Sequence, residues 1–126
     1  MPDRIIKIAT DVITLAENEQ YAGLILNDDG TPSHHLVLLP EDHDDMPWQA
    51  AVDWAKSVSG ELPTRREQSL LFANCKQHFK RDWYWSSELN ASAASFAWYQ
   101  DFNYGLQYYR HLFNQCRAVA VRRLPI

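Results

Sequence analysis

The 126-residue sequence contains only two cysteines, Cys75 and Cys116, which are too few for a disulfide framework. They do not form a Cys-x-x-Cys pair, and none of the five histidines lies at a zinc-ligand spacing from either of them. The sequence therefore predicts two free thiols and no zinc site. A bridge between the two cysteines stays open, because they fall in different predicted elements.

Long hydrophobic runs are also missing, since no apolar stretch approaches the roughly 18 residues needed to span a bilayer. The first residues lack the basic region, the long apolar region and the small-residue cleavage site of a secretory signal. We therefore expect no membrane association and a protein that is made and folded in the cytoplasm.

Positive charge is scarce, because 12 Lys and Arg residues face 16 Asp and Glu residues and leave a net charge of −4. Without a global positive field the sequence disfavours nonspecific nucleic-acid binding, and we expect no specific nucleic-acid partner. Repeats, low-complexity tracts and linkers are absent as well. With this length and 46% hydrophobic residues, we expect one globular domain over residues 1–126.

The N-terminal region, residues 4–40, has the β-branched residues and the partial alternation of strands. Residues 4–14 indicate a first strand. Residues 21–26 and 34–39 indicate a hairpin whose turn is Asp29-Gly30, since both residue types tolerate positive φ.

Pro40 is expected to end the second hairpin strand. The acidic segment Glu41–Asp45 that follows is predicted to be a solvated connection before a helix, because Asp near a helix N-terminus complements the helix dipole. A cation site and a mimic of nucleic-acid phosphates are the alternatives for this segment.

Two helices are predicted next. The first begins at Pro47, carries one apolar face and is stopped by Gly60. The second begins at a capping box, in which Thr64 and Glu67 satisfy backbone donors reciprocally, and continues to about His78.

The last part of the chain, residues 83–126, is rich in Trp, Tyr, Phe, Asn, Ser and His and has almost no Lys or Glu. This composition is typical of a recognition surface rather than of a solvated coat. Alternation with period two predicts strands here, with a turn at Asn103-Tyr104-Gly105. The residues assigned to the core are Trp83, Trp85, Trp98, Phe102, Val119 and Val121.

These segments predict an α+β fold, because strands, two helices and further strands follow one another. The expected units are the N-terminal strand and hairpin (4–40), the two helices (47–79), and the C-terminal strands and display loops (83–126).

Several short motifs, in this order and spacing, resemble one family. They are Leu62-Pro63-Thr64 before an acidic residue and a helix, Tyr84-Trp85-Ser86-Ser87, Ala97-Trp98-Tyr99 with Phe102, Gly105, and Arg117-Ala118-Val119 ending in Val121-Arg122. The chain from residue 46 to 126 resembles the phage and bacterial domain-of-unknown-function family that includes the Lcl C-terminal-type domain. That family is related to the C-type-lectin fold, which also houses formylglycine-generating enzymes and the variable proteins of diversity-generating retroelements.

The resemblance implies a C-type-lectin-like fold, in which two helices flank a small twisted antiparallel sheet, the terminal strands pair and the termini lie close together. It also implies a framework of Trp, Ser, Gly and Arg-Val positions, with ligand-facing positions between them. In this chain the positions between them are Asn90, Ala93, Tyr99, Asp101, Asn103, Tyr104, Tyr108, Tyr109 and His111. All except Ala93 are candidate ligand-binding residues, and Tyr and Asn suit this role because Tyr offers large contact area with few rotors and Asn both donates and accepts hydrogen bonds. The plainer interpretation is that Tyr104, Tyr108 and Tyr109 cover the sheet.

Catalysis is not expected. The formylglycine-generating relatives bind copper through two cysteines near the C-terminal end, where this chain has only Cys116, so we expect neither oxidase activity nor a cofactor. Ser86 or Ser87 with His111 and Asp101 can be drawn as a hydrolytic triad, but no nucleophile elbow supports it. The Glu-Pro-Asn, Gln-Pro-Asp and Trp-Asn-Asp motifs of calcium-dependent lectins do not occur. A metal-independent glycan site on stacked aromatic rings is the remaining small-ligand alternative.

The sequence and the resemblance together predict a non-catalytic phage or prophage binding module. Its late loops are expected to contact a protein partner of the host or the virion, and an exposed aromatic surface with a sheet edge favours a homo-oligomer. A cytoplasmic inhibitor or modulator of a host defence protein is the alternative setting, beside a virion-associated protein.

Overall fold

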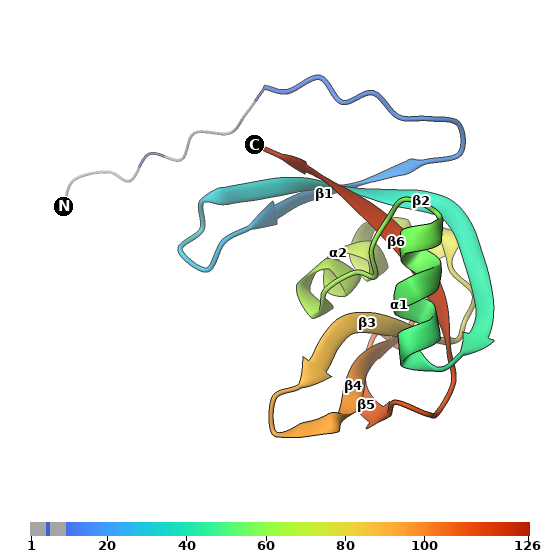
Figure 1. Cartoon of the computed structure of the whole chain (residues 1–126). Helices are drawn as coiled ribbons and strands as arrows, with labels where there is room; N and C mark the ends of the chain where they lie inside the picture. The colour runs from blue at the N-terminus through green and yellow to red at the C-terminus, as the bar shows by residue number, and fades with distance from the viewer. Residues whose placement is uncertain (1–4, 6–9) are drawn as a thin grey trace.

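The computed structural model describes Ile5 and residues 10–126, and these residues form two helices and a six-stranded sheet (Figure 1). The α+β class predicted from the sequence is confirmed. The elements in chain order are β1 (Gln20–Leu26), β2 (Pro32–Met46), α1 (Trp48–Ser57), α2 (Arg65–Cys75), the short 3-10 helix η1 (Lys76–His78), β3 (Trp83–Asn90), β4 (Ala93–Asp101), β5 (Gln107–His111) and β6 (Cys116–Pro125). No helix of the described residues is long and apolar enough to cross a membrane.

The sheet has the strand order β1-β2-β6-β3-β4-β5, so the last strand enters its centre. β6 pairs antiparallel with β2 and parallel with β3, where Tyr84 lies opposite Arg117. All other pairs are antiparallel. The predicted purely antiparallel sheet is therefore wrong, and the sheet is mixed, because β6 joins the β1–β2 hairpin to the β3–β4–β5 ribbon.

The N-terminal region matches its prediction in part. The hairpin is confirmed, with Gly30 in its turn at a φ of +86°. The predicted strand over residues 4–14 is not found at Ile5 or at residues 10–14, and its other residues lie outside the described part of the chain. The described strands nearest the two ends, β1 and β6, do not pair as the resemblance implies, because β2 lies between them. The position of the N-terminus itself lies outside the described residues.

β2 is longer than predicted and includes the acidic segment up to Met46. Pro40 does not end the strand, because the β2–β6 register is interrupted between Leu38 and Asp42 and no ladder donor is needed there. Figure 1 shows β2 arching from the hairpin to the start of α1. Arg117 of β6 binds two of the acidic side chains, Asp42 at 2.8 Å and Asp44 at 3.2 Å. The acidic segment is therefore part of a strand tied to its neighbour and not a loop, although four of its five residues are exposed.

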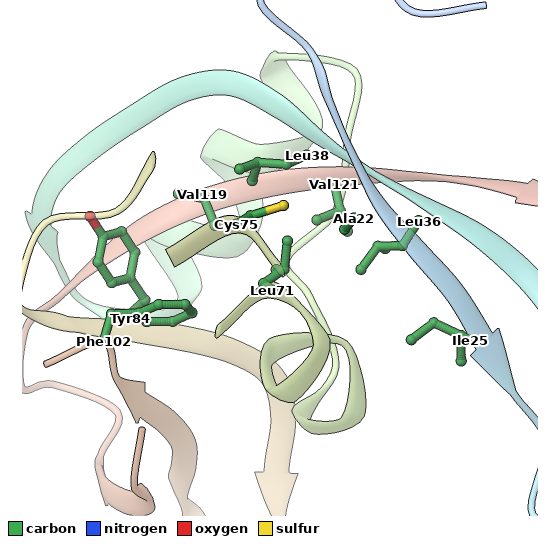
Figure 2. Packing of buried hydrophobic residues seen from close by; sticks show 10 residues of the cluster. All are labelled: Ala22, Ile25, Leu36, Leu38, Leu71, Cys75, Tyr84, Phe102, Val119 and Val121. Atoms are coloured by element: carbon green, nitrogen blue, oxygen red, sulfur yellow. The ribbon is translucent and has the colours of Figure 1, made fainter. Parts of the chain in front are cut away.

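The core has two clusters, and successive side chains of β6 belong alternately to one cluster and to the other. Val119 packs with Leu71 of α2 in one cluster, whereas Ala118 and Ala120 pack with Ala55 of α1 in the other. Because alternate strand residues point to opposite faces, α1 and α2 contact different faces of β6. Figure 2 shows the first cluster, with Tyr84 and Phe102 at one end and Ile25 at the other. Alanine on both sides of the α1 contact allows close approach of this helix to the sheet.

Four of the six residues assigned to the core are buried, namely Trp85, Phe102, Val119 and Val121. Trp83 is 38% exposed and Trp98 is partly exposed, so the assignment of these two is wrong. Tyr84 is fully buried instead. The reason is that both faces of β3 are covered at residues 84 and 85, while Trp83 at the start of the strand belongs to neither cluster.

Candidate functional site

The turn between β4 and β5 is built by Asp101 and Gly105. The Oδ1 atom of Asp101 accepts hydrogen bonds from the backbone N–H groups of Asn103 at 2.7 Å and Tyr104 at 3.4 Å. Gly105 has a φ of +80°, and a Cβ there would lie 2.7 Å from Cε1 of Phe72. Asp101 and Asn103 therefore shape the turn, and the turn holds the Tyr104 side chain in solvent with 75% exposure.

The other two late tyrosines lie on β5, which is an edge strand. Tyr108 is 58% exposed, and its ring stacks on that of Tyr109 with centroids 4.7 Å apart and an interplanar angle of 7°. Neighbouring side chains of a strand point to opposite faces, so this stack forms around the free edge of β5. The Tyr109 ring also meets the Trp98 ring edge-to-face at 5.2 Å. The tyrosine pair thus covers the sheet edge on a packed aromatic base.

Tyr99 does not face solvent, which corrects its expected placement among the displayed residues. Its exposure is 8%, and the Trp83 ring stacks on it with centroids 4.7 Å apart. Burial raises the pKa of the Tyr99 phenol. Tyr99 lies opposite Tyr108 in the β4–β5 register. Trp83, Tyr99 and Tyr108 therefore form an aromatic row across three strands, with Trp83 as the solvent-facing ring over Tyr99.

The eight predicted residues do not converge on one point. Asn90 lies at the β3–β4 turn, where its Oδ1 atom accepts a hydrogen bond from Ser92 N at 2.9 Å. That turn and the Asp101 turn are at opposite ends of the nine-residue strand β4, which corresponds to roughly 30 Å. His111 pairs with Phe96 toward the Asn90 end. Only the positions on and just before β5 therefore share one surface.

Two exposed apolar residues in this region were not selected from the sequence. Leu106 is 67% exposed before β5, and Phe113 is 83% exposed after it. Both lie in loops, where the strand alternation that marks core positions does not apply. An apolar residue in a loop is therefore the sequence signal by which the two could have been selected. We call the exposed side chains on and before β5, together with Trp83, the β5 surface, which consists of Trp83, Tyr104, Leu106 and Tyr108. Phe113 lies beyond the other end of the strand, with its ring centroid 5.0 Å from that of His111.

Two arginines lie over tryptophan rings next to β5. The Cζ atom of Arg65 is 3.5 Å from the ring centroid of Trp98, and its Nε atom donates to Oε1 of Gln107 at 3.1 Å. The Cζ atom of Arg110 is 5.0 Å from the ring centroid of Trp83. Such cation–π contacts are favourable and fix both partners. They bring residues together that are far apart in the sequence.

Four cavities, of about 490, 300, 230 and 140 Å³, lie elsewhere on the described molecule. The largest lies between the β1–β2 hairpin and α2 and is lined by Leu24, Arg66 and Leu70 among others. None of the four is lined by a residue of the β5 surface or by any of the eight predicted residues. The β5 surface is thus separate from all four of these hollows.

Glu67 has a perturbed pKa, but its carboxylate is saturated with hydrogen bonds. Arg123 donates to both oxygens at 2.7 and 2.8 Å, Thr64 N donates at 2.8 Å, and Nε2 of His34 lies 2.7 Å away. Burial raises the pKa of Glu67, and the hydrogen bonds from Arg123, Thr64 and His34 outweigh it and hold the pKa below its ordinary value of 4.5. This network joins α2 to β2 and β6, which is a structural role.

Tyr84 is the second perturbed group. Its hydroxyl donates to Oδ2 of Asp42 at 2.7 Å and accepts a hydrogen bond from Lys80 N at 3.0 Å. Burial and the neighbouring Asp42 carboxylate raise the pKa of the Tyr84 phenol far above its ordinary value. A phenol held protonated in this way is a poor nucleophile or base, and it ties the acidic part of β2 to β3.

The residues considered for an oxidase copper site or for a hydrolytic triad do not lie together in the structure. Cys75 is in the cluster of α2 and Cys116 in that of α1, and burial raises the pKa of both thiols. The described residues contain no group of three His, Cys, Asp or Glu side chains placed to hold a metal ion. Asp101 and His111 of the drawn triad lie at opposite ends of the β4–β5 pairing.

Comparison with protein-family models and with curated proteins gives no match for this chain.

Proposed function

We propose that this chain is a non-catalytic protein-binding module that recognises its partner through the β5 surface. The supporting observation is the concentration of exposed aromatic and aliphatic side chains, 38–75% exposed, on the edge strand β5, in the loop before it and at the start of β3. Exposed apolar patches of this kind mark interaction sites, and Tyr and Trp are enriched among the few residues that dominate the binding energy of protein interfaces.

The geometry favours a macromolecular partner over a small ligand. Small molecules bind in concave pockets that bury most of their surface. The four cavities lie away from the β5 surface. Its rings are also anchored, because Tyr108 stacks on Tyr109 and Trp83 stacks on Tyr99. Anchored rings lose little conformational entropy on binding, which suits them as contact residues.

The resemblance to the Lcl C-terminal-type family adds three elements to the proposal. These are a C-type-lectin-like arrangement of the sheet and helices, a phage or prophage origin, and a partner from the host or the virion. The proposed binding surface is the same whether this chain is a cytoplasmic modulator of a host protein or a virion-associated protein.

The test compares binding by the full chain and by the double variant Tyr104→Ala/Tyr108→Ala, whose two side chains are exposed and need not change the fold. A partner is captured from bacterial or virion extract, identified and purified, and its affinity for both proteins is measured. The double variant is expected to bind at least about tenfold more weakly, as for loss of interface hot spots.

The matched control is Val12→Ala/Leu26→Ala, which removes exposed apolar side chains away from β5 and is expected to bind normally. Circular dichroism verifies that both variants are folded. Equal affinity of the tyrosine variant and the unmodified chain would refute the proposal. Binding to a glycan array that depends on Trp83 would favour the metal-independent glycan alternative instead.

A further inference from the structure

The arginines of the described residues differ in their partners. Four of them form ion pairs with carboxylates, and these pairs are Arg66–Asp28, Arg117–Asp42, Arg122–Glu19 and Arg123–Glu67. Arg110 of β5 has no carboxylate oxygen within 4.0 Å in the described part of the chain. Its Nη1 atom donates to the backbone oxygen of Gln115 at 3.2 Å, and its guanidinium lies over the exposed Trp83 ring.

Arg110 has no direct carboxylate partner among the described residues. Residues 102–126 contain no Asp or Glu at all. Two carboxylates of the neighbouring strands are engaged with backbone N–H groups, since Asp101 binds the turn residues and Oε2 of Glu88 accepts from Arg65 N at 2.7 Å. A guanidinium has five N–H donors, of which Gln115 occupies only part. The β5 surface is therefore both aromatic and cationic, within a chain whose net charge is −4.

We propose that the partner of the β5 surface presents an acidic segment, with a carboxylate that binds Arg110 and apolar side chains that cover Tyr108 and Trp83. This inference rests on the proposed protein-binding function. A carboxylate on a half-buried guanidinium forms charge-assisted hydrogen bonds, which are about twice as strong as neutral ones. The complementarity is local, so it fits a short acidic segment better than an extended polyanion such as a nucleic acid, which the net negative charge repels.

The experiment selects short random peptides, displayed on yeast, against the immobilised full chain. Binders that also bind the Tyr104→Ala/Tyr108→Ala variant are discarded, so that only binders of the β5 surface remain. The net charge of the enriched peptides is read by sequencing. Their affinities are then measured for the unmodified chain, for Arg110→Gln, and for Arg66→Gln, which removes the same charge from an arginine that pairs with Asp28 of the β1–β2 hairpin.

We expect enrichment of Asp and Glu, a loss of about tenfold or more in affinity with Arg110→Gln, and no loss with Arg66→Gln. Enrichment of neutral or basic peptides, or normal binding by Arg110→Gln, would overturn the acidic partner and leave the proposed function standing. If no selected peptide loses binding to the Tyr104→Ala/Tyr108→Ala variant, both the acidic partner and the proposed protein-binding function would be overturned. Tyrosine- and Arg110-dependent binding of a single-stranded thymidine oligonucleotide, without enrichment of acidic peptides, would assign the surface to nucleic acid and overturn the inference.

Discussion

Glu67 illustrates how one residue serves two levels of structure. Its place three residues after Thr64 predicts a capping box, and both reciprocal bonds are present. The same carboxylate is fully buried and binds Arg123 on β6 and His34 on β2. Burying a carboxylate is costly unless it is paired and hydrogen-bonded, and here four donors compensate it. The local motif is readable from the sequence, whereas the two distant partners are not.

Replacing Glu67 by Gln is expected to lower the free energy of unfolding by about 3 kcal/mol at neutral pH, because the partly buried Arg123 loses its buried carboxylate partner and keeps only the exposed Glu61. The pKa of Glu67 is lower in the folded state, so its contribution is present above the ordinary value of 4.5 and is lost as the pH falls through the lowered pKa. The difference between the two proteins should therefore shrink in acid. Urea unfolding over a pH series measures it.

Glu61 provides the control, because it pairs with the same Arg123 but has a side chain that is 67% exposed. Glu61→Gln should cost less than about 1 kcal/mol, as solvent screens exposed pairs. Equal costs for the two variants would show that burial does not decide the strength of this network.

At the scale of elements, the junction after α1 shows why a glycine was needed. The sequence predicts Gly60 as the residue that stops the helix, but the helix ends at Ser57 and the left-handed residue is Ser59, with a φ of 64°. Glycine is required at position 60 because the neighbouring side chains leave no room for a Cβ atom. A Cβ there would lie 2.7 Å from Cδ1 of Leu39 and 2.9 Å from the Cβ of Ala120. Tertiary packing of the loop against β2 and β6, rather than helix termination, determines this residue.

Gly60→Ala is expected to lower the free energy of unfolding by about 2 kcal/mol, because the new methyl group overpacks the contact with the sheet. Ser59→Gly should leave stability unchanged or raise it by up to about 1 kcal/mol, because a side chain is unfavourable in the left-handed region. Chemical unfolding of both variants tests this order. A larger loss for Ser59→Gly would mean that helix termination at residue 59 matters more than packing at residue 60.

At the scale of the whole molecule, the two faces of the sheet have separate cores. Cys75 lies in the cluster of α2 and Cys116 in the cluster of α1, on the two sides of β6. Both thiols are free, so the bridge that the sequence left open is absent from the structure. Burial raises the pKa of the Cys116 thiol to about 12, and it also raises that of Cys75.

We expect both thiols to react with DTNB only as fast as the protein opens, because thiolate is the reactive form and is rare at neutral pH in these sites. In denaturant both should react at once. The melting temperature should not change when a reductant is added. Rapid modification of either thiol in the native protein, or a melting temperature that falls with reductant, would contradict the two-core arrangement.

The candidate site follows the same division between local and tertiary information. The exposure of Tyr104 and Tyr108 was predicted because they lie between the motifs that carry the family resemblance, and both side chains are exposed. The exchange of Tyr99 and Trp83 was not predicted, because which of two stacked rings faces solvent depends on how far the helices extend over β3 and β4. Arg110 escaped notice for a related reason, since its lack of a carboxylate partner among the described residues depends on how distant segments of the chain are arranged.

Local sequence signals are sufficient to predict the β1–β2 hairpin with its glycine turn, the capped start of α2, the α+β order and the aromatic composition of the last strands. These depend on turn chemistry, capping and periodicity over a few neighbouring residues. Long-range packing is needed to explain why β6 enters the sheet between β2 and β3, why the acidic segment is a strand bound by Arg117, and why Trp83 rather than Tyr99 faces solvent. Those outcomes depend on contacts between residues far apart in the chain, whose energies no short stretch of sequence contains.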